Sequence, residues 1–213
     1  MQLPKRLKPK RLIAAGLCAT LVATAPPAFS KTGPAESLIS RIVDYIASVL
    51  PSAAHEAPAG QVVEAAFSPD GGAEALILKV IGTARVSLRL AGYSFTSPKI
   101  VRALLDAHRR GVDIAVVVDN DGNRSKASKQ ALNLLVNAKV RTRTIDRYAI
   151  HHDKYIVVDA RHVETGSFNY SAAAAARNSE NVLVVWNNPA LASQYLAHWQ
   201  NRFDQGIDYR SNY

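Results

Sequence analysis

The stretch IHHDKYIVVDARHVETGSFNYS (residues 150–171) places histidines, a lysine and an aspartate around an apolar run. Its β-branched centre predicts a strand over residues 152–159, and side chains along a strand alternate between the two faces of a sheet. His152 and Lys154 then share one face and can contact one ligand. Asp159 points to the other face, where it is placed to orient the strand end.

The second half of this stretch adds two more polar groups at a spacing of two. A turn at Gly166 allows Ser167 and Asn169 to return to the face that carries His152. His151 lies on the opposite face from His152, which argues against chelation of one metal by the two neighbouring histidines. The sequence thus predicts a polar site built around His152 that has no metal and no cofactor.

Around this stretch, β-branched apolar runs alternate with helical patterns. Strands are predicted over residues 86–93, 112–119, 140–145, 155–159 and 181–186, and helices over 74–81, 98–110, 125–137 and 189–203, with Gly111 ending the second helix. The run 119–130 resembles a calcium loop, but Arg124 and Gln130 replace the glycine and glutamate that such a loop needs. The alternation predicts an α/β sandwich around a mostly buried mixed or parallel sheet.

The first thirty residues combine a basic start, an apolar run and the small residues Ala28 and Ser30. This pattern predicts a signal peptide (residues 1–30) cleaved after Ser30, and hence export to the periplasm or beyond the cell. Residues 31–60 are predicted to be a linker with one amphipathic helix over 36–50, and residues 61–213 one domain. The leader carries five of the 26 basic residues and no acidic one, so the net charge falls from +9 to +4. Charge alone is therefore weak evidence for a polyanionic partner.

The spacing H-x-K-x4-D-x6-G-S-x-N is filled by six residues: His152, Lys154, Asp159, Gly166, Ser167 and Asn169. This pattern resembles the signature of the phospholipase D superfamily, and residues 61–213 resemble its small, single-motif bacterial endonucleases. The resemblance implies a phospholipase D-like α-β-α sandwich. It also implies metal-independent cleavage of phosphodiesters through a phosphohistidine that water hydrolyses.

The resemblance further implies a role for each motif position. His152 attacks phosphorus, a second histidine protonates the leaving oxygen, and Lys154, Ser167 and Asn169 bind the phosphate. Glu180 is expected to hydrogen-bond the far nitrogen of the histidine, and Asp159 is counted with the catalytic residues of the motif. Tyr93 and Phe95 follow a predicted strand; they can face the site, but core packing is the favoured interpretation.

Only one H-x-K occurs in the chain, yet the implied reaction uses two histidines. A two-fold homodimer that shares one active site supplies both copies of His152; a second histidine from the same chain stays open. The expected substrate is nucleic acid, DNA and possibly RNA, contacted through its backbone. The alternatives are a phospholipase D or phosphatidyl transferase acting on membrane phospholipid, with the helix at 36–50 touching the membrane, and a non-catalytic nucleic-acid-binding module.

Overall fold

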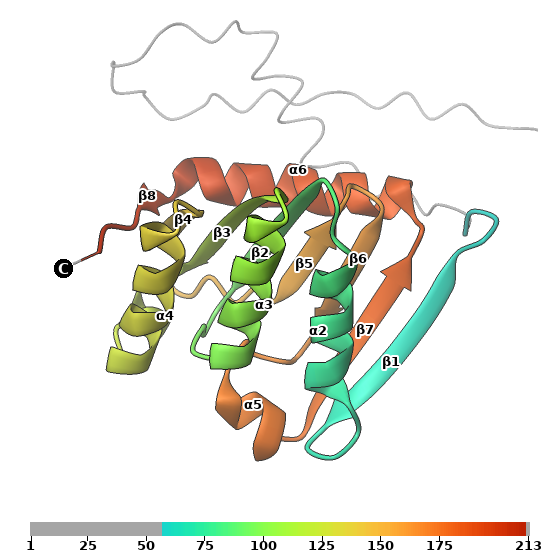
Figure 1. Cartoon of the computed structure of the whole chain (residues 1–213), viewed down its shortest axis with the longest axis horizontal. Coiled ribbons are helices and arrows are strands. Elements are labelled where there is room, and N and C mark those ends of the chain that lie inside the picture. The colour runs from blue at the N-terminus through green and yellow to red at the C-terminus, as the bar shows by residue number, and fades with distance from the viewer. Residues whose placement is uncertain (1–56, 212–213) are drawn as a thin grey trace, which may run out of the picture. The chain divides into compact units, whose positions relative to one another are not determined.

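Eight strands form a single mixed sheet with helices on both faces (Figure 1). The computed structural model describes residues 57–211, so the predicted leader and the predicted helix at 36–50 lie outside the described residues. The strands follow the order β1-β7-β6-β5-β2-β3-β4-β8. Their bounds are β1 Val62–Ser68, β2 Ser87–Gly92, β3 Asp113–Asp119, β4 Arg141–Ile145, β5 Tyr155–Val158, β6 His162–Gly166, β7 Glu180–Trp186 and β8 Ile207–Asp208. Only β2, β3 and β4 pair in parallel among these strands, so the sheet is mixed.

Two apolar cores lie on opposite faces of this sheet. Helices α2 (Ala73–Thr83), α3 (Pro98–Arg109) and α4 (Lys126–Asn137) cover one face, and α6 (Pro189–Gln205) covers the other (Figure 1). Strand β3 contributes side chains to both cores. Val116 and Val118 pack with the first group of helices, whereas Ala115 and Val117 pack with Trp199 of α6. The predicted α-β-α sandwich is therefore confirmed. In residues 57–211 no helix combines the length and hydropathy needed to cross a membrane.

The predicted helices and strands agree with the structure to within about two residues, with one exception. The strand predicted over 152–159 begins only at Tyr155. The backbone N–H of His151 donates to the Asp119 carboxylate at 2.8 Å, and the carbonyl of Lys154 accepts from Thr165 Oγ1 at 3.2 Å. In residues 151–154, hydrogen bonds with side chains thus replace the backbone pairing of a strand. Gly111 ends α3 with φ +91°, a left-handed conformation that favours glycine.

A carboxylic acid lies in the larger core. Glu164 on β6 is 1% exposed and accepts a hydrogen bond from Tyr170 Oη at 2.8 Å. Burial raises the pKa of Glu164 from 4.5 to about 8, although the bond from Tyr170 opposes the rise. The native state therefore keeps its proton over a pH range in which the unfolded chain has lost it.

This proton makes stability depend on pH. A raised native pKa stabilises the fold fully below the unfolded value and loses that contribution as pH rises towards about 8. Between pH 6 and 7 the free energy of unfolding should fall by up to ~1.4 kcal/mol. Glu164→Gln should abolish this fall, whereas Asp70→Asn at an exposed position should retain it. Urea unfolding of the three proteins at both pH values measures how much the free energy of unfolding falls. An equal fall in wild type and Glu164→Gln would contradict the assignment.

Candidate active site

The motif residues other than Asp159 lie at one edge of the sheet, where β2 and β6 end and β5 and β7 begin. In α/β sheets, the crevice beyond the carboxyl ends of parallel strands is the usual ligand site. Asp119, at the end of β3, fixes the segment before β5: one carboxylate oxygen binds the N–H of His151, and the other accepts from the N–H of Gly122 at 2.6 Å. The chain therefore enters the site in a defined position.

His152 and Lys154 lie together at this edge. His152 is exposed, and its ring lies 4.8 Å from that of Tyr93 at a 58° tilt. Lys154 is 8% exposed, its Nζ donates to the His152 carbonyl at 3.0 Å, and it lies 5.5 Å from the centre of the Tyr93 ring. Burial lowers the pKa of Lys154, although the charges of Glu180 and Asp153 oppose the shift. The site thus holds an imidazole open to solvent beside a partly desolvated cation.

The assignment of Tyr93 to the core is corrected by these contacts. Tyr93 touches both His152 and Lys154, whereas Phe95 is fully buried as predicted. Residues two apart on a regular strand share one face, so the different surroundings of Tyr93 and Phe95 arise because β2 ends at Gly92 and the chain bends at Tyr93.

Ser167 and Glu180 form a hydrogen-bonded pair next to Lys154. Ser167 Oγ donates to Glu180 Oε2 at 2.6 Å and accepts from the N–H of Asn181 at 3.0 Å. Glu180 Oε1 accepts from the side chain of Asn178 at 2.9 Å. Within residues 57–211 of one chain, the hydrogen bonds of Glu180 go to Ser167 and Asn178, and its expected bond to the histidine stays a prediction.

Gly166 and Asn169 are the two remaining motif positions near the turn. A Cβ on Gly166 would lie 2.2 Å from the Asn181 carbonyl oxygen, so glycine alone fits there. Beyond Ser167 the side chains alternate: Phe168 and Tyr170 are buried in the core, while Asn169 takes the other direction. The Oδ1 atom of Asn169 is buried and has no hydrogen-bond partner within residues 57–211, so it keeps acceptor capacity close to the site.

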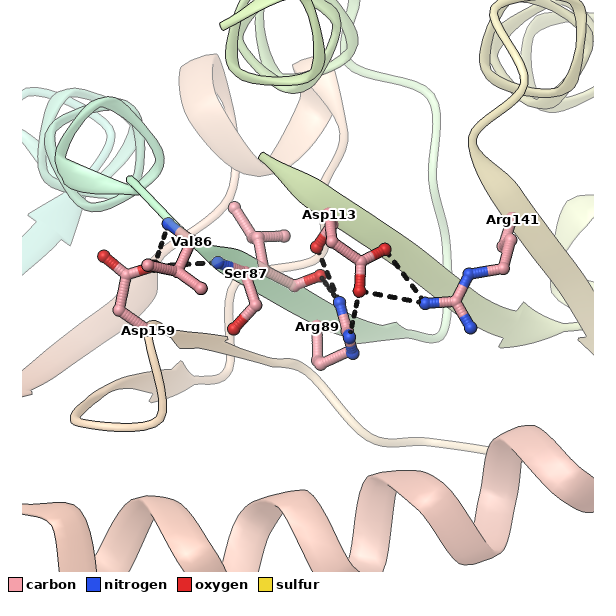
Figure 2. Close-up of polar contacts among 7 residues, drawn as sticks. Val86, Ser87, Arg89, Asp113, Arg141 and Asp159 are labelled. Carbon is pink, nitrogen blue, oxygen red and sulfur yellow. Dashed lines mark hydrogen bonds and ion pairs between the residues drawn. The ribbon is translucent and has the colours of Figure 1, made fainter. Parts of the chain in front are cut away.

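Asp159 lies outside the site, at the opposite edge of the sheet. Val158 pairs with Leu88 near the start of β2, whereas the site lies where β2 ends. The Asp159 carboxylate accepts from the backbone N–H groups of Val86 and Ser87 at 2.8 and 2.9 Å, as Figure 2 shows, and from the N–H of Arg85 at 3.0 Å. Asp159 therefore joins β5 to β2 and does not line the pocket that His152 and Lys154 line, in agreement with its predicted orientation.

A second ionic group supports the same edge. Asp113 at the start of β3 binds Arg89 at 2.5 Å and Arg141 at 3.0 Å (Figure 2). Burial opposes ionisation of Asp113, but the hydrogen bonds from the two arginines outweigh it and leave its pKa lowered. Asp113 and Asp159 thus hold the edge that faces away from the site.

A pocket of about 430 Å³ opens at the site. His152, Lys154 and Gly166 of the motif line it, together with six residues that were not predicted: Asp153, Tyr155, Thr165, Gln194, Tyr195 and His198. The last three come from α6, more than 40 residues along the chain from His152. No sequence pattern links α6 to the motif, so this wall of the pocket could be found only in three dimensions.

Residues 77–205 match the family model described as cardiolipin synthase, PLD-like domain. The chain belongs to the phospholipase D superfamily. Within the superfamily, Nuc from Salmonella typhimurium, a phospholipase D family member of known crystal structure, is 48% identical. The match covers 71% of this chain and 99% of Nuc, with a TM-score of 0.70.

Two curated relatives extend the comparison within the superfamily. A phospholipase D of Rickettsia bellii is 38% identical over 140 residues, 66% of this chain and 68% of that protein. A mitochondrial cardiolipin hydrolase of Xenopus laevis is 36% identical over 130 residues, 61% of this chain and 60% of that protein. The superfamily relationship makes the chain a phosphodiesterase, and its relatives carry names that point to different substrates.

Proposed function

We propose that the protein is a metal-independent phosphodiesterase that cleaves nucleic acid, with little preference for sequence, through a phosphohistidine. The observation that carries the proposal is the exposed His152 imidazole beside the buried Lys154 ammonium in one pocket. A nucleophile and a cation for the phosphoryl oxygens are the two groups that phosphodiester displacement needs first.

The proposed reaction has two displacements. An imidazole nitrogen of His152 attacks phosphorus, the P–O bond to the leaving group breaks, and the leaving oxygen takes a proton from a second histidine. Water then attacks the phosphohistidine, the P–N bond breaks, and the second histidine accepts the proton of the water. Lys154, Ser167 and the side-chain amide of Asn169 are proposed to bind the phosphoryl oxygens throughout.

The second candidate substrate is phospholipid, because the curated relatives are named phospholipase D and cardiolipin hydrolase. Nucleic acid is favoured by the similarity to Nuc, which spans nearly all of that chain, and by the resemblance to small single-motif endonucleases. Purified protein incubated with plasmid DNA, single-stranded DNA, RNA and phosphatidylcholine vesicles separates the two. Release of choline from the vesicles, with the nucleic acids left intact, would identify phospholipid as the substrate.

Excess EDTA is expected to leave the rate of cleavage unchanged. The motif supplies the nucleophile, the phosphate-binding groups and, in a dimer, the acid, so no step is assigned to a divalent ion. The same substrate panel with and without chelator measures this. Activity that disappears with EDTA and returns with Mg²⁺ would reject the metal-independent mechanism.

We also propose that two copies share the site. Val63, Phe67 and Leu183 are 51%, 58% and 37% exposed and lie on one face of β1 and β7, here called the β1–β7 face. Leu183 is paired with Thr165, which lines the pocket, so this apolar face continues to the site. A second copy that covers the face brings its own His152 towards the first.

Mixing wild-type and His152→Asn chains tests the shared site. With equal amounts and random pairing, about a quarter of the dimers contain two intact chains, so about a quarter of the activity should remain. Independent sites would retain about half. Specific activity is measured against mutant fraction, with the mass checked by light scattering. A linear decrease, or a fully active monomer, would contradict the proposal.

A further inference from the structure

An aspartate–histidine pair lies in the pocket beside the motif. His198 Nε2 on α6 lies 2.9 Å from Oδ2 of Asp153, which stands between His152 and Lys154 in the chain. The side chains of Asp153 and His198 are 33% and 39% exposed, and both line the pocket. The Tyr155 ring, which packs edge-on against Tyr195 at 4.9 Å, lies 6.0 Å from the imidazole and limits its movement.

The Asp153 carboxylate is the acidic group that faces the His198 ring. Burial opposes ionisation of Asp153, but the hydrogen bond with His198 and the charges of His151, His198 and Arg202 outweigh it, and its pKa is lowered. His151 Nδ1 lies 3.4 Å from the same oxygen, and burial lowers the pKa of His151, although the charges of Asp153 and Asp119 oppose the shift. The Asp153 carboxylate is therefore placed to accept a hydrogen bond from Nε2–H of His198.

We propose that His198 is a second phosphate contact, which binds the phosphate next to the scissile one and so selects substrates with consecutive phosphodiesters. Nε2–H donates to Asp153, and Nδ1–H donates to an oxygen of the neighbouring phosphate. This inference rests on the proposed function. A polynucleotide offers such a phosphate at each step of its backbone, whereas a phospholipid with one phosphodiester offers none.

Asp153 is then a positioning residue that acts through His198. Without the imidazolium, the Asp153 carboxylate would leave a negative charge in a site that must accept a phosphate. In the proposed pair the imidazole stands between the carboxylate and the ligand. Removing His198 should therefore weaken binding twice, through a lost charged hydrogen bond and through an unmasked carboxylate.

The first test measures binding without turnover. In a His152→Asn background, a 5′-fluorescein-labelled decathymidylate is titrated with protein across a salt series, and anisotropy gives the affinity. His198→Gln should weaken binding by about 10-fold and reduce the slope of log affinity against log salt by about 0.7. Lys129→Gln, which removes an exposed cation from α4, serves as the matched control and should change affinity by less than about twofold.

Asp153→Asn separates a positioning role from a direct one. Because Asp153 acts through His198, the double variant should bind no more weakly than His198→Gln alone, and the single effects should not add. Additive losses, or an unchanged salt slope in His198→Gln, would overturn the proposal.

The second test uses active enzyme and two substrates. Bis(4-nitrophenyl) phosphate has one phosphodiester and no neighbouring phosphate, whereas the decathymidylate has several. His198→Gln should lower the ratio of kcat/KM for the oligonucleotide to kcat/KM for the chromogenic ester by about 10-fold. An equal loss on both substrates would show a structural role. If the wild type cleaves neither substrate, the proposed function fails, while the binding series still decides the role of His198.

Discussion

Replacing His152 with asparagine is expected to lower kcat by about 10⁴-fold or more, because the reaction loses its covalent nucleophile. The fold should be unaffected. His152 is exposed, and its ring contacts the ring of Tyr93. Its replacement therefore leaves no buried polar group without a hydrogen-bond partner. Initial rates on plasmid DNA and thermal unfolding of the same preparations measure the two effects separately.

His108→Asn is the matched control for this variant. His108 lies on α3, away from the pocket, and its replacement should retain the wild-type rate. An active His152→Asn enzyme would assign the nucleophile to another residue. A covalent protein–DNA adduct, trapped in the wild type by a denaturing quench at alkaline pH because acid hydrolyses the P–N bond, and missing in His152→Asn, would identify the intermediate directly.

Lys154→Met is expected to give the second largest loss, about 10²–10³-fold in kcat, if Lys154 stabilises charge on the phosphoryl oxygens as a preorganised donor does. Methionine keeps most of the length of the side chain and can pack against the Tyr93 ring. Burial already disfavours the ammonium of Lys154 in the free protein. Stability should therefore be retained or slightly increased while turnover falls.

Lys129→Met on the exposed surface of α4 controls for the change of charge. The decisive comparison is kinetic: loss of kcat with little change in KM indicates an interaction made in the transition state. A variant with unaltered kinetics and a lower melting temperature would return Lys154 to a purely structural role.

Most of the fold could be predicted from the sequence, because its strands are apolar and its helices are bounded by strong signals. Ser97 and Ser125 cap α3 and α4 through their side chains, and Pro98 and Pro189 open α3 and α6. The strands that were not predicted, β1, β6 and β8, are short or carry exposed and polar residues. Pairing with neighbours rather than composition makes them strands.

The candidate site could likewise be predicted only in part. His152 and Lys154 line one pocket with Gly166, but they precede β5, and Asp153 between them lines the same pocket, so strand alternation does not explain their shared position. The partners of Glu180 and the place of His198 depend on contacts between segments far apart in the chain. His198 meets Asp153 across 45 residues, and no periodicity or spacing encodes that distance.

The position of Asp159 separates the motif into two parts that can be lost independently. The carboxylate satisfies backbone N–H groups at the start of β2, a need that exists whether or not the pocket is active. A homologous chain that has lost its equivalents of His152 and Lys154 would still gain stability by keeping this aspartate. In genome surveys the aspartate is therefore a marker of ancestry, and only the histidine and lysine are evidence that a member still cleaves its substrate.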